Sequence, residues 1–451
     1  MKRRIIAALC AICMLIPLSS CAFTSPSAII SAEINDKGEL VLIFNDGSEQ
    51  NLGVVVGSDG ADGKDGENGA DGINGTDGKD GTDGSLTITG ASGSVTAAVS
   101  KGLRSAVSIV CNFTATVQQG GWRPGSSSST TKQYSSGGSG VIYQLDKSEG
   151  DAFIITNYHV VYDASSDTKN GISDDISVYL YGAEIEEKAI KATYVGGSLY
   201  YDIAVLRVED SDVIKSSDVA AIDIADSDKV SVGENAIAIG NAKGYGISAS
   251  SGVVSVDSEY LTMTAADGKT AVSFRVMRVD TAVNSGNSGG GLYDGEGRLI
   301  GIVNAKIVDD GVENIGYAIP SNVAISIANN IIDYCYGTEL ERVQRALLGI
   351  TVTLTDSRAV YDAESGKMSI VENVAIYEIS SGSLAAEVLQ VGDVLVSATI
   401  GGQTRPITRQ YHVIDMMLDM RAGDTVEFLI LRGGEEKTVS FTITEDCLTE
   451  Y

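Results

Sequence analysis

A serine, a histidine and an aspartate stand at the ends of apolar runs, in an order that could build a nucleophilic active site. Ser288 lies within the glycine-rich segment Gly286–Gly290, and His159 is one of only two histidines in the chain. A serine hydroxyl needs an adjacent base to react near neutral pH. The order His159, Asp202, Ser288 is that of one of the convergent Ser-His-Asp triads. It predicts Ser288 as the nucleophile, His159 as the base, and Asp202 as the residue that orients the imidazole.

Short β-rich segments must position these residues. From about residue 100 to 325, apolar runs alternate with Gly, Ser, Asp and Asn, and this pattern favours β-barrels. A Gly/Ser-rich loop is expected over residues 119–139. Residues 321–334 read as a helix, with Pro320 before it and Ser321 and Asn322 available as caps. The runs are residues 105–110, 140–143, 152–155, 203–208, 236–239 and 299–303.

A smaller β/α unit follows, over about residues 345–446. It contains a helical stretch at residues 411–418 and strand-like runs at residues 425–431 and 437–443. The second histidine, His412, lies near the start of this helix and is expected on the surface.

Taken together, these segments resemble the HtrA (DegP/DegS-like) family of trypsin-fold serine proteases, with one C-terminal PDZ domain. The resemblance rests on the segments around His159, Asp202 and Ser288, and on residues 297–302 and 314–322. It implies a mostly β fold: a trypsin-like double β-barrel protease domain at residues 100–335, followed by a PDZ (β/α) domain at residues 345–446.

The resemblance also assigns the substrate-facing residues. The backbone N–H groups of Gly286 and Ser288, with Asn287 shaping the turn, should bind the oxyanion. Ala282 corresponds to the base of the specificity pocket, with Ile302 and Val303 as walls. This neutral pocket predicts cleavage after small or medium aliphatic residues.

The PDZ-like unit should capture extended peptides through their C-terminal carboxylate. Leu348, Gly349 and Ile350 resemble its carboxylate-binding loop, where a strand edge and backbone N–H groups meet the peptide. A PDZ fold that only packs on the protease is the alternative. The chain's own end, residues 448–451, is a further candidate to cap this groove.

The sequence departs from the family beside the nucleophile. Ser285 and Gly291 stand where the family usually has proline, and losing both prolines should loosen the loop that shapes the oxyanion hole.

The N-terminus reads as a processing segment. Residues 1–20 combine a basic start with a short apolar stretch, and the small residues before Cys21 predict a lipoprotein signal peptide with lipidated Cys21. An ordinary signal peptide is the alternative. Residues 21–56 would form a tether with a short β unit. Glycine then occurs at every third position over residues 57–84, ten times without proline. A short collagen-like triple helix and a flexible acidic spacer both remain open.

Composition excludes several partners. The formal net charge is −28, which argues against nucleic acid or anionic lipid as partners. Removing the signal takes away Lys2, Arg3 and Arg4 and makes the mature chain more acidic. Three cysteines remain after Cys21 (Cys111, Cys335 and Cys447), so at most one disulfide can form, and their separation argues against a zinc site. No metal and no organic cofactor is implied.

These features predict a serine endopeptidase, anchored by lipid on the extracytoplasmic side of a bacterial membrane. It would cleave unfolded or mislocalised proteins in quality control, bind hydrophobic C-terminal peptides at the PDZ domain, and assemble as a homotrimer. The alternative is a catalytically silent PDZ scaffold or chaperone-like binding protein, which the altered loop at Ser285 and Gly291 would favour.

Overall fold

The computed structural model describes residues 29–37, 39–45, 47–54, 94–120, 127–305 and 315–450. The chain divides into two compact units, residues 1–84 and residues 85–451. In the first unit, β1 (Ile29–Ile34), β2 (Glu39–Phe44) and β3 (Glu49–Val54) pair as an antiparallel sheet. The predicted signal peptide, Cys21 and the Gly-X-Y run lie outside the described residues. Within the described ranges, no helix is long and apolar enough to cross a membrane.

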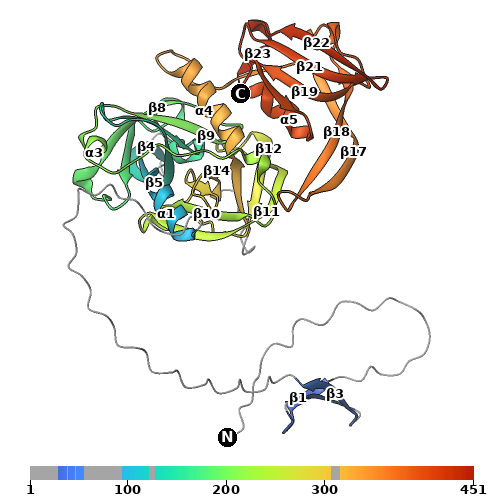
Figure 1. The fold of residues 1–451 in the computed structure, drawn as a ribbon. Helices are drawn as coiled ribbons and strands as arrows, with labels where there is room; N and C mark the ends of the chain where they lie inside the picture. The colour runs from blue at the N-terminus through green and yellow to red at the C-terminus, as the bar shows by residue number, and fades with distance from the viewer. Residues whose placement is uncertain are drawn as a thin grey trace, which may run out of the picture. The chain divides into compact units, whose positions relative to one another are not determined.

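The second unit begins with a helix and a closed barrel (Figure 1). Helix α1 (Val95–Leu103) is capped by Ser94, whose hydroxyl accepts the Ala97 N–H. The barrel closes in the order β4-β5-β6-β9-β8-β7, and β7 shows the alternation of buried and less buried residues expected of a strand with one face in a core. Its strands are β4 (Ala106–Gly120), β5 (Ser127–Asp146), β6 (Asp151–Thr156), β7 (Asp175–Leu180), β8 (Ile190–Ser198) and β9 (Ile203–Val208).

A second barrel follows and confirms the predicted trypsin-like double-barrel fold. It closes in the order β10-β11-β12-β15-β14-β13. The strands are β10 (Asn235–Gly240), β11 (Ser248–Thr264), β12 (Ala271–Val279), β13 (Gly291–Tyr293), β14 (Leu299–Val303) and β15 (Gly316–Pro320). Short helical segments connect the barrel strands: α2 (Tyr158–Val161), η1 (Lys169–Gly171), η2 (Glu186–Lys188), α3 (Asp212–Lys215), η3 (Ser227–Lys229) and η4 (Ala242–Gly244).

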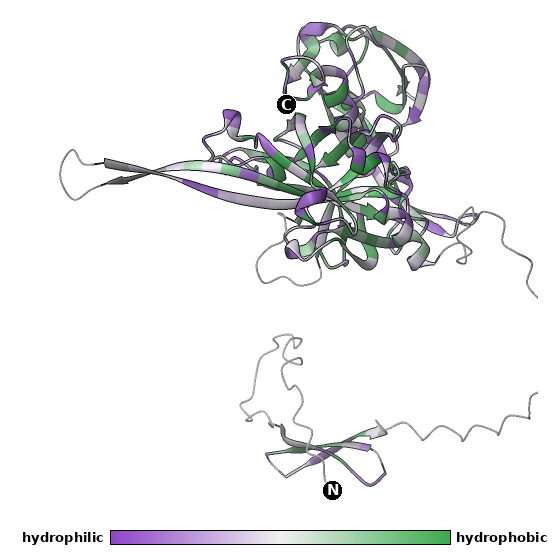
Figure 2. Ribbon diagram, turned by 90° about the vertical axis from the view of Figure 1, so that its left-hand side faces the viewer, coloured by the Kyte–Doolittle hydropathy of each residue, from purple (hydrophilic) through white to green (hydrophobic). Residues whose placement is uncertain are grey.

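The predicted loop over residues 119–139 is largely strand. β4 and β5 pair without a break from Ala106↔Val141 to Gly120↔Ser127, so that they form a two-stranded ribbon extending beyond the barrel (Figure 2). Ser and Thr dominate the outer part of β5, and these residues give no hydrophobic alternation from which a strand could be read. The backbone pairing with β4 holds this polar strand instead.

One apolar core joins the two barrels to α4 (Ser321–Cys335). It contains Ile203 of the first barrel, Ile239 of the second barrel and Ile327 of the helix. The predicted helix is present, but the predicted caps are not. The Ser321 hydroxyl donates to the Ala225 carbonyl, and the Asn322 amide donates to Asp226 and Asp228, so both side chains tie the helix to η3 instead.

The C-terminal part is a second β layer with its own core, built around Phe428 and Leu395. Its sheet has the order β17-β18-β19-β21-β22, with β20 on β19. Its elements are β17 (Ile350–Asp362), β18 (Lys367–Ile379), η6 (Leu384–Glu387), β19 (Val394–Ile400), β20 (Gln403–Pro406), α5 (Gln410–Asp415), η7 (Met416–Leu418), β21 (Thr425–Arg432), β22 (Glu435–Thr442) and η8 (Glu445–Cys447).

Strand β16 (Gln344–Ala346) links the two parts and pairs with the last strand, β23 (Leu448–Glu450). The end of the chain is therefore part of a small sheet with the linker. This pairing contradicts the idea that residues 448–451 cap a groove along β17. Cys111, Cys335 and Cys447 are all free thiols.

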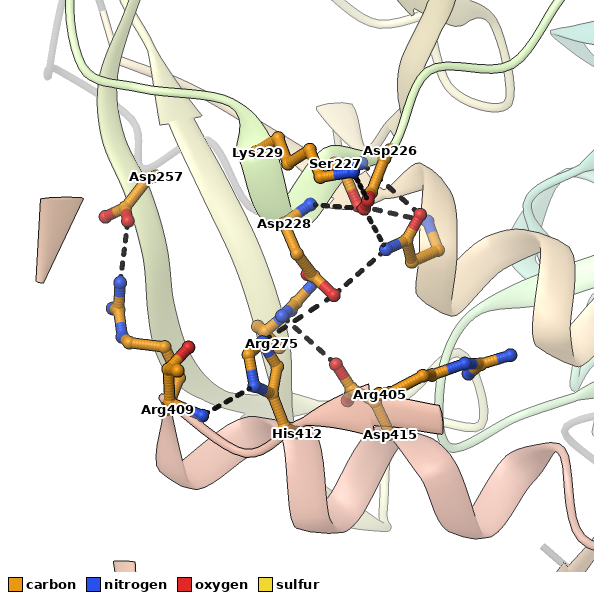
Figure 3. A network of polar contacts seen from close by, with 12 residues as sticks. Asp226, Ser227, Asp228, Lys229, Asp257, Arg275, Arg405, Arg409, His412 and Asp415 are labelled. Atoms are coloured by element: carbon orange, nitrogen blue, oxygen red, sulfur yellow. Dashed lines mark hydrogen bonds and ion pairs between the residues drawn. The ribbon is translucent and has the colours of Figure 1, made fainter. Parts of the chain in front are cut away.

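A buried polar network fastens α5 to the second barrel (Figure 3). Arg275 of β12 pairs with Asp228 of η3 at 2.8 Å and with Asp415 of α5 at 3.1 Å. Its guanidinium lies 3.8 Å from the centre of the Tyr411 ring. The prediction that His412 is a surface residue was wrong, because the second barrel covers the face of α5 on which it lies. Its side chain is only 17% exposed, and Nε2 lies 3.7 Å from Asp228.

Candidate active site

His159 and Asp202 meet at one end of the first barrel. His159 lies in the α2 turn directly after β6, and Asp202 precedes β9. The imidazole Nδ1 and Asp202 Oδ2 are 2.6 Å apart, and the His159 backbone N–H donates to Oδ1 at 2.9 Å. Asp202 adopts a φ of 55°, a conformation rare for a residue with a side chain. Through these two hydrogen bonds, both carboxylate oxygens of Asp202 fix the position of His159.

The second barrel supplies one more hydrogen bond to this carboxylate. The Asn304 side-chain amide, just beyond β14, donates to Asp202 Oδ2 at 2.8 Å, and Asn304 is fully buried. No local motif singles out Asn304, because its contact with Asp202 exists only once the two barrels are packed together.

Ser288 lies in a tight loop of the second barrel, and the hydrogen bonds of this loop leave two N–H groups free. The Asn287 N–H donates to Asn284, the Gly289 N–H to Val303, and the Gly290 N–H to Asn287. Among the described residues, neither the Gly286 nor the Ser288 N–H has an acceptor. These are the two donors expected to form the oxyanion hole. Buried N–H groups are rarely left unpaired unless a ligand or water takes them.

The orientation of the Gly286 N–H follows from its neighbour. The Ser285 carbonyl accepts the Lys243 N–H at 2.7 Å. Because a trans peptide places C=O and N–H on opposite sides, this bond turns the Gly286 N–H away from Lys243. Gly286 has a φ of +96°, and a Cβ there would lie 2.2 Å from the Asn241 carbonyl oxygen. Only glycine fits this position.

The Ser288 hydroxyl makes no hydrogen bond to another described residue. The nucleophile loop nevertheless lies against the His159 segment, because a Cβ added to Gly289 would meet Thr156 Oγ1 at 2.3 Å and the Asn157 nitrogen at 2.9 Å. Hydrogen bonds between nucleophile and base are often long without substrate and shorten when it binds.

The three predicted pocket residues do not share one surface. Ala282 is exposed, and its carbonyl accepts the Ser250 hydroxyl at 2.8 Å. Ile302 and Val303 are buried on both faces of β14, in two different apolar cores. Because neither reaches solvent, neither can contact a substrate side chain in this conformation. The prediction of a neutral specificity pocket therefore depends on Ala282 alone.

The predicted carboxylate-binding residues lie at the start of the C-terminal sheet. Leu348 is buried, Gly349 has a φ of +71°, and Ile350 opens β17. β17 is an edge strand, and α5 lies beside it. The Gln410 side-chain amide donates to the Val352 carbonyl at 3.2 Å, so α5 already contacts the strand edge that a peptide would join.

Comparison with known proteins finds similarity to serine proteases. Residues 138–302 match the family described as trypsin-like peptidase domain. A serine protease Do-like HtrA of Lactococcus lactis subsp. cremoris (strain MG1363) is 34% identical over 369 residues, which cover 78% of this chain and 83% of that protein. The periplasmic serine endoprotease DegP of Escherichia coli (strain K12) is 30% identical over 310 residues, which cover 68% and 57%.

Among solved structures, one of the HtrA-type protease AlgW with a tripeptide is similar to this chain. The similarity covers 78% of this chain and 97% of that one. Its TM-score is 0.48, and its sequence is 24% identical.

Proposed function

The chain belongs to the HtrA family of serine proteases, and from this premise we propose that His159, Asp202 and Ser288 carry out its reaction. The protein is a serine endopeptidase with a trypsin-like fold. The observation that carries the assignment of residues is the pair of N–H groups without an acceptor, at Gly286 and Ser288, within the segment Gly286–Gly290, whose other three N–H groups each donate a hydrogen bond to a described residue. The carboxylate-bound His159 lies on the segment packed against that loop.

The proposed mechanism begins with proton transfer from Ser288 to His159. Asp202 accepts a hydrogen bond from Nδ1, so that Nε2 is the nitrogen available as base. Ser288 Oγ then forms a bond to the substrate carbonyl carbon, and the π electrons of that carbonyl move to its oxygen. Asp202 stabilises the resulting imidazolium. His159 next gives the proton to the leaving amine, and water repeats the sequence to release the acyl group.

The negative charge on the carbonyl oxygen is expected at the Gly286 and Ser288 N–H groups. Such donors favour the transition state over the bound substrate, and losing one costs roughly 3–4 kcal/mol in comparable sites. Ser285 and Gly291 stand where the family usually has proline, and in this chain contacts from Lys243, Val303 and Ser139 hold the loop.

The substrates are proposed to be unfolded or mislocalised proteins on the extracytoplasmic side of the membrane. Lipid attachment at Cys21 would hold the enzyme there, and residues 57–84 would separate it from the surface. The C-terminal sheet with α5 would act as a PDZ domain for hydrophobic C-terminal peptides, because β17 offers an edge strand beside a helix. Assembly as a homotrimer is proposed from the family resemblance.

A fluorophosphonate probe tests the assignment of residues, because it reacts only with an activated serine. We expect labelling of Ser288, identified by mass spectrometry, and a large loss of labelling in His159→Ala. Labelling of another serine, or equal labelling in the variant, would contradict the assignment. If labelling occurs only after a hydrophobic C-terminal peptide is added, the enzyme is latent and is activated by peptide binding at the C-terminal sheet. Absent labelling under both conditions would favour the scaffold alternative.

A further inference from the structure

Ser139 of β5 contacts both residues that carry the free N–H groups. Its backbone N–H donates to the Ser288 carbonyl at 2.8 Å, and its hydroxyl donates to the Gly286 carbonyl at 2.7 Å. Ser139 is fully buried. It belongs to the first barrel, whereas Gly286 and Ser288 belong to the second. A side chain from one barrel therefore holds the nucleophile loop of the other.

The same hydroxyl also holds the segment that orients the Gly286 N–H. It accepts the Asn241 N–H at 2.8 Å, and two residues later the Lys243 N–H binds the Ser285 carbonyl. The Asn241 side chain stabilises this turn by accepting the Gly246 N–H at 2.8 Å and by donating to the Ser108 hydroxyl at 2.6 Å.

The consequences for the oxyanion donors follow from peptide planarity. The Ser285 carbonyl fixes the peptide plane that contains the Gly286 N–H, and the Gly286 carbonyl fixes the following plane, which contains the Asn287 N–H and joins Gly286 to the rest of the loop. The Ser139 hydroxyl binds the second plane directly and reaches the first through Asn241 and Lys243. Its removal would leave the Asn241 N–H and the Gly286 carbonyl without this partner, and the two planes could rotate.

We propose that Ser139 is a positioning residue for the oxyanion hole, and that its hydroxyl holds the Gly286 N–H group in place across the interface between the barrels. This inference rests on the proposed function of Ser288. The donors act on charge that develops in the transition state, so their misplacement lowers kcat and leaves KM nearly unchanged.

The test compares Ser139→Ala with Ser173→Ala in residues 85–451, which form a compact unit of their own. Ser173 is a matched control in the first barrel. It is buried, its hydroxyl donates to the Asn112 carbonyl at 2.8 Å, and it accepts the Asp175 N–H at 3.2 Å. The substrate is a fluorogenic peptide designed from a mapped casein cleavage site. Melting temperature, kcat and KM are measured for each variant.

We expect kcat of Ser139→Ala to fall by about 10- to 100-fold with little change in KM, because small displacements of oriented groups have effects of this size. A peptide trifluoromethyl ketone, whose adduct carries an oxyanion, should lose affinity by the same factor. Ser173→Ala should lower the melting temperature by about as much as Ser139→Ala does, but it should keep the kcat of the parent protein. If Ser139→Ala does not fold, Ser139→Cys replaces it, since the thiol is a weaker donor of similar shape.

A Ser139 variant with the parent kcat and ketone affinity would overturn the inference, as would equal losses in Ser139→Ala and Ser173→Ala. Ser288→Ala separates this failure from that of the proposed function. If Ser288→Ala is inactive while Ser139→Ala is unaffected, only the role of Ser139 is wrong. If Ser288→Ala keeps its activity, the active-site assignment itself is wrong.

Discussion

The unit of residues 85–451 contains two interfaces that differ in chemistry. The first joint, as we call it, is the interface between the two barrels, and the second joint is the interface between α5 and the second barrel. Where the two barrels meet, neutral groups dominate: the Ser139 hydroxyl, the Asn304 amide and backbone N–H groups hold the loop and the carboxylate. Where α5 meets the second barrel, Arg275 and Arg409 enclose the Tyr411 ring, with centroid distances of 3.8 and 4.9 Å.

The difference predicts different behaviour. Neutral hydrogen bonds to backbone groups set fixed positions and depend little on pH or salt. Buried ion pairs contribute little net stability because desolvation offsets their attraction, yet removing one partner is costly. Some buried side-chain nitrogens of the second joint, among them Arg275 Nε and Arg409 Nε, have no hydrogen-bond partner among the described residues. We therefore expect the first joint to govern chemistry and the second to govern domain attachment.

The largest effect should come from Asp202→Asn in the first joint. An asparagine amide would place a donor against the His159 N–H groups and favour the wrong tautomer, so kcat should fall by about 10⁴-fold while the fold remains. Peptide hydrolysis and calorimetry measure both quantities. Asp175→Asn, which removes a carboxylate bound to Asn112 and Lys191 on the outside of the same barrel, should keep full activity.

Arg275→Ala should mainly break the second joint. It removes the buried cation that pairs with Asp228 and lies against the Tyr411 ring, which should cost about 3–5 kcal/mol of the free energy that holds the two parts together. Calorimetry should then show separate unfolding of the C-terminal sheet, with peptide hydrolysis close to that of the parent. Arg278→Ala, on the same strand but partly exposed, should change neither. Loss of peptide hydrolysis in Arg275→Ala alone would show that the joints are not separate.

The second joint should also respond to pH. Burial raises the pKa of Asp415 to about 7 against the opposing effect of Arg275, so the folded state favours the neutral acid. Its contribution to stability is complete below its ordinary pKa near 3.8 and is lost as pH rises through about 7. Burial lowers the pKa of His412, so its contribution runs the other way and is lost as pH falls through that lowered value.

Asp415→Asn isolates the first of these effects. The free energy of unfolding of the variant, relative to that of the parent protein, should rise from about pH 4 to about pH 7. The slope should be at most about 1.4 kcal/mol per pH unit. The charged groups around Asp415 and His412 are Asp228, Arg275, Arg409, Asp226 and Asp419. A difference that does not change with pH would contradict the buried, neutral Asp415.

The smallest effect belongs to Lys367, at the turn between β17 and β18. Its Nζ lies 2.7 Å from Glu234 Oε1 of the second barrel, and the lysine side chain is 46% exposed. An exposed pair of this kind contributes about 1 kcal/mol or less. Lys367→Ala should therefore shift the unfolding of the C-terminal sheet only slightly, and high salt should remove the difference. A loss as large as that of Arg275→Ala would place the attachment at the hairpin instead.

Local motifs were enough to predict the double-barrel fold and to select His159, Asp202 and Ser288. Each lies in a short segment whose residue types reveal its place beside a strand end or in a turn. Ser139, Lys243 and Asn304 could not be predicted, because each acts through a hydrogen bond to a segment that is distant in the chain. Ser139 binds Gly286, Lys243 binds Ser285, and Asn304 binds Asp202.

The wrong predictions have the same origin. Ile302 and Val303 belong to a strand buried on both faces, so their apolar character reports the core and not a pocket. His412 lies on the side of α5 that the second barrel covers, and a helix read alone does not show its partner. Ser321 and Asn322 have the side chains of helix caps, yet they bind Ala225 and Asp226, directly before η3.

The most direct test of the account is casein cleavage by residues 85–451 and by their Ser288→Ala variant, with reduced casein as the unfolded substrate. The account predicts cleavage by the parent and none by the variant, at unchanged melting temperature. Cleavage by both proteins at the same rate would contradict it, because the nucleophile would then lie outside the joint between the barrels.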